Sequence, residues 1–211
     1  GHIYLPSIID STHHANMIFD TGASGQLLVD TVYLKEQRWT INTSMWGRLR
    51  GTNGYSRVKV SQRRHKVEHG KASETFPYMV LGNLRSVLGK HADGIFGSND
   101  FERLPLEINY QQRFIRKLNT IPDSVKRNYQ CLPLTFKDKD CLIKATIWFN
   151  GQAIEGHYII DTGSGNDVFF TEATTKQYNL ESYKGEKRVG HGLDMGLGDG
   201  GVSTWIDAYA D

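Results

Sequence analysis

The chain contains the triplet Asp-Thr-Gly twice, each time directly after a short apolar segment. The first copy, residues 20–22, follows Met17-Ile18-Phe19, and the second, residues 161–163, follows Tyr158-Ile159-Ile160. At average residue usage a given triplet arises at roughly 2 in 10,000 positions, so two copies in similar surroundings indicate a repeat. The structural alternative is that each triplet merely ends a strand in a turn, because Asp and Gly favour turns.

Two aspartates at the ends of buried strands have the chemistry of a carboxylate pair that shares one proton. A buried charge is costly, and like charges about 3 Å apart cannot both ionise. Of Asp20 and Asp161, one would stay ionised and take a proton from a bound water, while the other would polarise a substrate carbonyl. The glycines permit close backbone approach, and the threonine hydroxyls can bond buried backbone groups.

The segments that must position these aspartates have mainly strand-like patterns. Alternating apolar residues on both sides of Asn150-Gly151 predict a hairpin with strands at residues 142–149 and 154–160. Further strands are expected at residues 3–9, 15–20, 57–60 and 105–110, and short helices at residues 98–103 and 171–178. The sequence therefore predicts an all-β protein with few short helices.

The order of these segments repeats along the chain. Each half has a hairpin, the triplet, an apolar stretch and then a glycine-bearing turn, at residues 51–54 in one half and 196–201 in the other. Residues 118–130 separate the two halves and are interpreted as a linker. We therefore expect a first unit at residues 1–117 and a second at residues 131–211.

In combination these motifs resemble those of aspartic peptidases, which carry one Asp-Thr-Gly motif in each of two lobes. Ala92-Asp93-Gly94-Ile95-Phe96-Gly97 resembles the hydrophobic-hydrophobic-Gly segment that packs behind the catalytic loop in that superfamily. The run through residues 101–110 resembles bacterial members with retropepsin-like lobes. The resemblance covers nearly the whole chain and implies a two-lobed acid-protease fold of the pepsin and retropepsin type, with a lobe in each unit.

The resemblance also implies roles for the residues of both motifs. Asp20 and Asp161 would be the catalytic pair, and Thr21 and Thr162 would form crossed hydrogen bonds between the lobes. The activity implied is hydrolysis of peptide bonds in a cleft between the lobes, without metal or cofactor. The residues expected to support the catalytic loops are Thr21, Gly22, Ala23, Thr162, Gly163 and Ser164.

Two further features follow from the comparison with this family. The turns that contain Gly54, Tyr55 and Gly198 would be flaps that close over substrate. The second half departs from the pattern, because the position equivalent to Ile95-Phe96-Gly97 would lie beyond residue 211. We therefore expect an incomplete second lobe, either because the chain is a fragment, because residues have been left out of it, or because the lobe is degenerate.

The fourth motif residue differs between the halves. In two-lobed relatives a hydroxyl at this position donates to the outer carboxylate oxygen, and here Ser164 provides it while the first half has Ala23. A donated hydrogen bond favours the charged carboxylate. The sequence therefore predicts that Asp161 is the ionised base and that Asp20 carries the shared proton, unless Ser24 replaces the missing hydroxyl.

Composition and the remaining residues limit the alternatives. Lys and Arg total 25 against 23 for Asp and Glu, too small an excess for binding nucleic acid or a membrane surface by bulk charge. No apolar run approaches the roughly 18 residues of a membrane span. His65 and His69 have no evident third ligand, so no metal site is expected. Cys131 and Cys141 are expected either to form one disulfide or to remain free thiols.

Three functions are consistent with the sequence. The first is an aspartic endopeptidase acting on peptide or protein substrates, as a monomer with both lobes in one chain. The second is a catalytically silent peptide-binding module that retains the fold. The third is a lobe that dimerises with a copy in another chain. The resemblance favours a periplasmic, cell-envelope or secreted location, although the start at Gly1 does not indicate a compartment.

Overall fold

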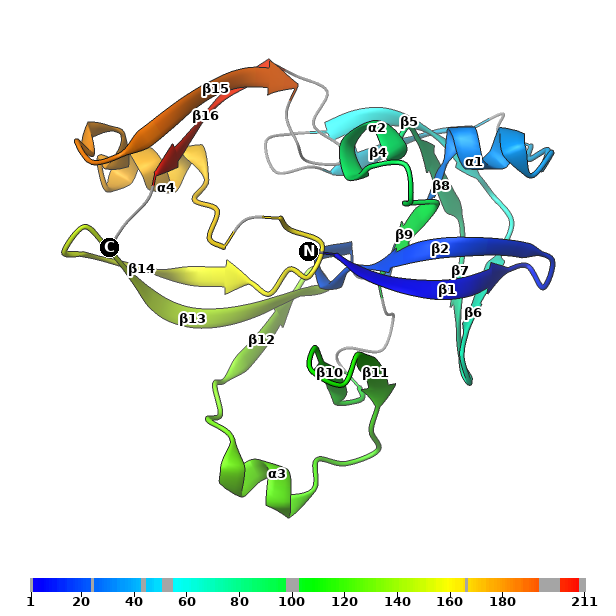
Figure 1. The fold of residues 1–211 in the computed structure, drawn as a ribbon, viewed down its shortest axis with the longest axis horizontal. Coiled ribbons are helices and arrows are strands. Elements are labelled where there is room, and N and C mark those ends of the chain that lie inside the picture. Colours follow the sequence, from blue (N-terminus) through cyan, green and yellow to red (C-terminus); the bar gives the residue numbers. More distant parts are fainter. Residues whose placement is uncertain are drawn as a thin grey trace.

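The fold is mainly β, as predicted from the sequence (Figure 1). The computed structural model describes residues 2–23, 25–42, 45–50, 55–97, 103–165, 167–193 and 202–208. This part of the chain contains sixteen strands and four short α-helices. None of the helices in these ranges is long and apolar enough to cross a membrane.

The first half forms one nine-stranded sheet in the order β4-β5-β8-β3-β9-β2-β1-β6-β7. A single turn of 3₁₀ helix, η1 (Thr21–Ala23), follows β2, and the short helices α1 (Thr31–Glu36) and α2 (Arg85–Leu88) follow β3 and β8. The strands are β1 (Ile3–Ile9), β2 (His13–Phe19), β3 (Leu27–Asp30), β4 (Met45–Arg50), β5 (Tyr55–Ser61), β6 (His65–His69), β7 (Ala72–Phe76), β8 (Met79–Gly82) and β9 (Gly94–Phe96).

The centre of this sheet is β9, which lies between β2 and β3. It runs parallel to β2 and antiparallel to β3. Gly94 allows this position, because a Cβ atom there would lie 2.5 Å from the carbonyl oxygen of Leu28. β9 therefore joins the strand that leads into Asp20 to the strand that follows the η1 turn.

Both faces of the sheet are covered by apolar side chains. One cluster includes Met17, Phe19 and Phe96, and the cluster on the opposite face includes Ile18 and Ile95. Neighbouring residues alternate between the clusters because side chains of a strand point to opposite faces. Burial on both faces explains why the run before Asp20 is continuously apolar.

The rest of the chain forms smaller sheets. The hairpin β10 (Leu106–Asn109) and β11 (Phe114–Lys117) packs against the first half, and α3 (Asp123–Asn128) lies within the expected linker. The second half contains the three-stranded sheet β12 (Leu134–Lys137), β13 (Asp140–Phe149) and β14 (Gln152–Ile159), followed by α4 (Glu172–Gln177), η2 (Leu180–Ser182) and the pair β15 (Lys187–Leu193) and β16 (Val202–Ala208).

The local predictions for the second half are confirmed at its hairpin and its helix. Asn150 and Gly151 have φ values of 50° and 73°, as a primed two-residue turn requires. The helix expected at residues 171–178 is α4. The helix expected at residues 98–103 falls almost entirely outside the described residues.

The second half has much less core than the first. Among residues 131–189, residue 166 left out, Ile154 is the single fully buried apolar residue, while Trp148 is 70% exposed and Phe169 is 49% exposed. The apolar segment at residues 167–170 is not a strand, unlike β3 in the first half. The reason is topological: no strand equivalent to β9 pairs with it in the described chain.

Candidate active site

The two Asp-Thr-Gly motifs meet, although 141 positions separate them (161 − 20). Asp20 directly follows β2 and Asp161 comes shortly after β14, so each carboxyl group stands at the end of a strand. Each glycine packs against the carboxyl group of the other half. A Cβ atom on Gly22 would lie 2.8 Å from Cγ of Asp161, and one on Gly163 would lie closer still to Asp20. Only glycine fits at these two positions.

Thr21 and Thr162 make four hydrogen bonds that join the two motifs. The Thr21 amide donates to Oγ1 of Thr162 at 3.1 Å, and the Thr162 amide donates to Oγ1 of Thr21 at 2.9 Å. The Thr21 hydroxyl donates to the Ile160 carbonyl at 2.6 Å, and the Thr162 hydroxyl donates to the Phe19 carbonyl at 3.0 Å. The arrangement has local two-fold symmetry, because each carbonyl belongs to the residue two positions before a threonine.

The two carboxylates are oriented by equivalent backbone amides. Oδ1 of Asp20 accepts from the Gly22 amide at 2.7 Å, and Oδ1 of Asp161 accepts from the Gly163 amide at 2.8 Å. Oδ1 of Asp161 also accepts from the Ser164 amide at 3.1 Å. Each turn therefore fixes one oxygen of its own carboxylate.

The two carboxyl groups differ in burial. Asp20 is half-buried and Asp161 is exposed. Burial, followed by the charge of Asp161 and a side-chain hydrogen bond with it, raises the pKa of Asp20 to about 7, against the opposing amides of Gly22 and Ala23. The direction of this shift favours the protonated form of Asp20, and burial is its main cause.

The segment Ile95-Phe96-Gly97 lies directly behind the first motif. The Asp20 amide donates to the Phe96 carbonyl at 3.0 Å, and the Gly97 amide donates to the Gln26 carbonyl at 3.2 Å. One short strand therefore fixes both ends of the loop that contains Asp20.

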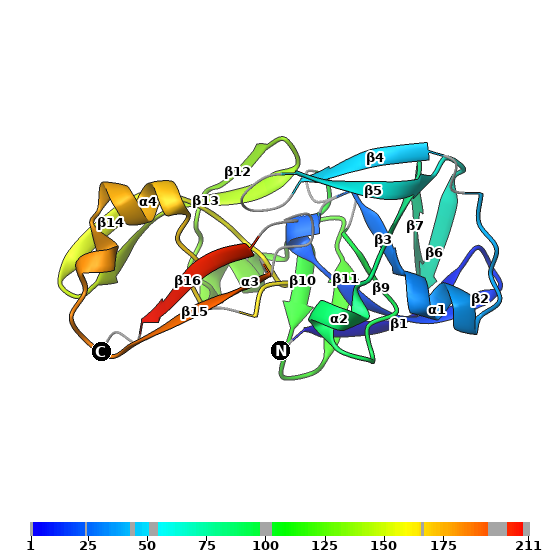
Figure 2. The same ribbon diagram turned by 90° about the horizontal axis from the view of Figure 1, so that it is seen from above.

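The flap candidates are only partly described. Gly54 and Gly198 lie outside the described residues, whereas Tyr55 begins β5 and is 62% exposed. The hairpin β4–β5 and the pair β15–β16 lie on the same side of the molecule, above the turn after β2 (Figure 1). Seen from above, their inner ends lie on either side of that turn (Figure 2).

Three further candidate residues, His65, Cys131 and Cys141, lie in other surroundings. His65 is buried between Ser61 and Asp10, with hydrogen bonds of 2.8 Å to each, and the described residues contain no cluster of three potential metal ligands. Cys131 and Cys141 are free thiols. The residue opposite Cys141 across the β12–β13 hairpin is Phe136, so of the two alternatives left open by the sequence the structure shows the free thiols.

Sequence reasoning found the motif residues but missed their hydrogen-bond acceptors, the carbonyls of Phe19 and Ile160. The available signal was position, since both residues precede a motif aspartate directly. No family model matches this chain, and no curated protein matches it. The geometry of the two motifs is therefore the basis for assigning a function.

Proposed function

We propose that this protein is an aspartic peptidase of two-lobed, pepsin- and retropepsin-like fold. It hydrolyses peptide bonds with a water molecule activated by Asp20 and Asp161. The observation that carries the proposal is the set of crossed hydrogen bonds between Thr21 and Thr162, which brings two carboxyl groups into contact at the ends of two strands. Such a pair binds and releases one proton as a unit.

The unequal burial of the carboxyl groups assigns their roles. The oxygen of the water attacks the peptide carbonyl carbon while Asp161 takes a proton from that water. At the same time Asp20 donates its proton to the carbonyl oxygen. In the second step the C–N bond breaks, the amine nitrogen takes the proton held by Asp161, and Asp20 regains a proton from the hydroxyl of the intermediate. The carboxyl pair thereby returns to its starting state with no covalent intermediate.

A peptide library tests the proposal directly. The full chain is incubated with the library at several pH values between 3 and 7, with and without a statine-type inhibitor, and products are identified by mass spectrometry. We expect inhibitor-sensitive cleavage at acidic pH that is lost in both Asp20→Asn and Asp161→Asn. The control Asp138→Asn, in the exposed turn between β12 and β13, should retain full activity.

Cleavage that survives both substitutions would overturn the carboxylate-pair mechanism. A second candidate function, peptide binding without turnover, is favoured by one observation. The second half lacks a described counterpart of β9 and leaves Asp161 exposed. Saturable binding of a statine peptide with no cleavage at any pH would select this function over the peptidase.

A further inference from the structure

The β4–β5 hairpin places two different chemistries on its two faces. On the inner face Leu49 and Val58 join the apolar cluster that contains Ile18 and Ile95. The outer face is exposed, and the register places Trp46 opposite Lys59 and Arg48 opposite Arg57. Tyr55 lies on the same outer face. We call Trp46, Arg48, Tyr55, Arg57 and Lys59 the cationic ladder.

The cationic ladder concentrates positive charge, and the repulsion between these charges destabilises the hairpin. Residues 45–61 contain four Lys and Arg and no Asp or Glu, in a chain whose net charge is +2. Two arginines directly opposite each other repel. Aromatic rings offset part of this repulsion: Cζ of Arg57 lies 4.3 Å from the centre of the Trp46 ring, and Cζ of Arg48 lies 5.2 Å from that of Tyr55.

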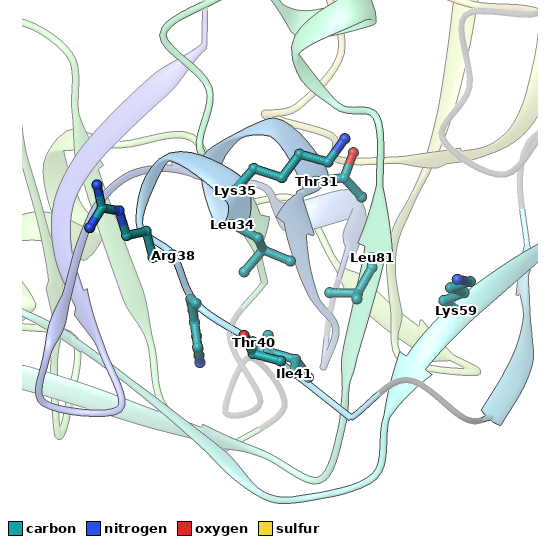
Figure 3. Close-up of a pocket in the computed structure, with 9 residues that line it drawn as sticks. Thr31, Leu34, Lys35, Arg38, Thr40, Ile41, Lys59 and Leu81 are labelled. Carbon is teal, nitrogen blue, oxygen red and sulfur yellow. The ribbon is translucent and has the colours of Figure 1, made fainter.

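Lys59 connects the ladder to an open pocket of about 450 Å³ between α1 and β8. Leu34 and Leu81 face each other across the middle of this pocket, and Lys35, Arg38 and Lys59 lie around its edge (Figure 3). The nine lining residues include no carboxylate. They are Thr31, Leu34, Lys35, Arg38, Trp39, Thr40, Ile41, Lys59 and Leu81.

We propose that the cationic ladder and this pocket form a docking site for an acidic protein segment with an apolar anchor residue. The guanidinium groups stacked on aromatic rings keep their N–H donors available for carboxylates, and the leucines provide an apolar floor for one aliphatic or aromatic side chain. The apolar floor favours a peptide over a nucleic acid.

The ladder shares Tyr55 with the flap candidates, but its charged residues lie on the face of the hairpin opposite the one that packs on Ile18 and Ile95, and none of them belongs to the two Asp-Thr-Gly motifs. Binding is therefore measurable without catalysis. The probe is a fluorescein-labelled twelve-residue peptide of Glu and Asp around a central Leu-Phe pair. Its affinity is measured by fluorescence anisotropy with the full-length Asp20→Asn protein, so that cleavage cannot consume the probe.

Two comparisons locate the binding. We expect Arg48→Gln combined with Arg57→Gln to weaken binding about tenfold, as the loss of two exposed charge pairs predicts. The matched control, Lys71→Gln combined with Lys90→Gln, removes the same charge from turns outside the ladder and pocket and should change affinity less than about twofold. A probe with Ser-Ser in place of Leu-Phe should bind more weakly to the unchanged ladder. Thermal unfolding monitored by circular dichroism confirms that each variant is folded.

Three results would overturn the proposal. Equal losses in the ladder variant and the control variant would mean that bulk charge binds the probe. Equal affinity for the Leu-Phe and Ser-Ser probes would remove the pocket from the site. Tighter binding of a twelve-residue oligothymidine, lost in the ladder variant, would assign the surface to single-stranded nucleic acid. Binding of the acidic probe that fails in the ladder variant supports the docking site even if the peptide library remains uncleaved.

Discussion

Thr21 and Thr162 each use an amide and a hydroxyl to bind the other half of the chain. Because each hydroxyl both donates and accepts, neither threonine can be replaced by an apolar residue without leaving a polar backbone group unpaired. The neighbouring Gly22 and Gly163 leave room for the opposite carboxyl group. The triplet is thus a contact between halves as much as a catalytic motif.

Replacing Thr21 by Val should destabilise the protein. Valine keeps the shape of threonine but removes the acceptor of the Thr162 amide and the donor to the Ile160 carbonyl. We expect the free energy of unfolding to fall by about 1–3 kcal/mol, measured by urea denaturation, with loss of peptidase activity. Thr21→Ser keeps the hydroxyl and should retain most of the stability, and equal losses in the two variants would contradict the hydrogen-bond explanation.

Asp20 should make stability depend on pH between about 4 and 7. Its pKa is raised to about 7 by folding, whereas an aspartate in the unfolded chain has a pKa near 4. In this window the folded protein holds more protons, so stability is greatest at pH 4 and falls as pH rises. Relative to Asp20→Asn, the wild type should lose about 2–4 kcal/mol of unfolding free energy from pH 4 to pH 7.

Urea denaturation at several pH values measures this difference. Asp138→Asn, in an exposed turn, should follow the wild type at every pH. Parallel pH profiles for Asp20→Asn and the wild type would show that folding leaves the proton affinity of Asp20 unchanged.

At the level of elements, local patterns predicted six of the sixteen strands, namely β1, β2, β5, β10, β13 and β14, and others, such as β9, depend on pairing between distant segments. The Asn150-Gly151 turn and the alternating residues beside it determine β13 and β14 without other information. The position of β9 between β2 and β3 depends on residue pairs that are 65 (94 − 29) to 77 (94 − 17) positions apart in sequence, which no local pattern encodes. The cationic ladder was also missed, because its charges are separated along the chain and meet only through strand register.

Gly94→Ala tests the central position of β9. A methyl group at this residue would lie 2.5 Å from the Leu28 carbonyl oxygen and 2.6 Å from Cε of Met17, so β2, β3 and β9 cannot keep their spacing. We expect a loss of at least about 2 kcal/mol in unfolding free energy. Gly82→Ala is the control, since its methyl group would contact only Cδ2 of Leu84 at 3.4 Å and should have a small effect. Equal stability of both variants would mean that β9 is not tightly enclosed.

At the scale of the whole molecule, the two halves repeat the same motif with unequal support. In the first half, β9 and two apolar clusters hold the strand and loop around Asp20. In the second, the described residues place mainly a three-stranded sheet and Ile154 beneath Asp161. The sequence predicted this difference, since only the first half contains an Ile-Phe-Gly segment. The contact through Thr21 and Thr162 therefore stabilises the second half more than the first.

Hydrogen exchange measures this dependence between the halves. Amides that open locally exchange faster where less apolar surface is buried, so amides of β13 and β14 should exchange at least about tenfold faster than those of β2 and β9. In Thr21→Val the rates in β13 and β14 should rise further, because that sheet loses two hydrogen bonds to the more stable half. The rates in β2 and β9 should change little, since both strands keep their neighbours in the nine-stranded sheet. Equal acceleration in both halves would instead indicate that they unfold as one cooperative unit.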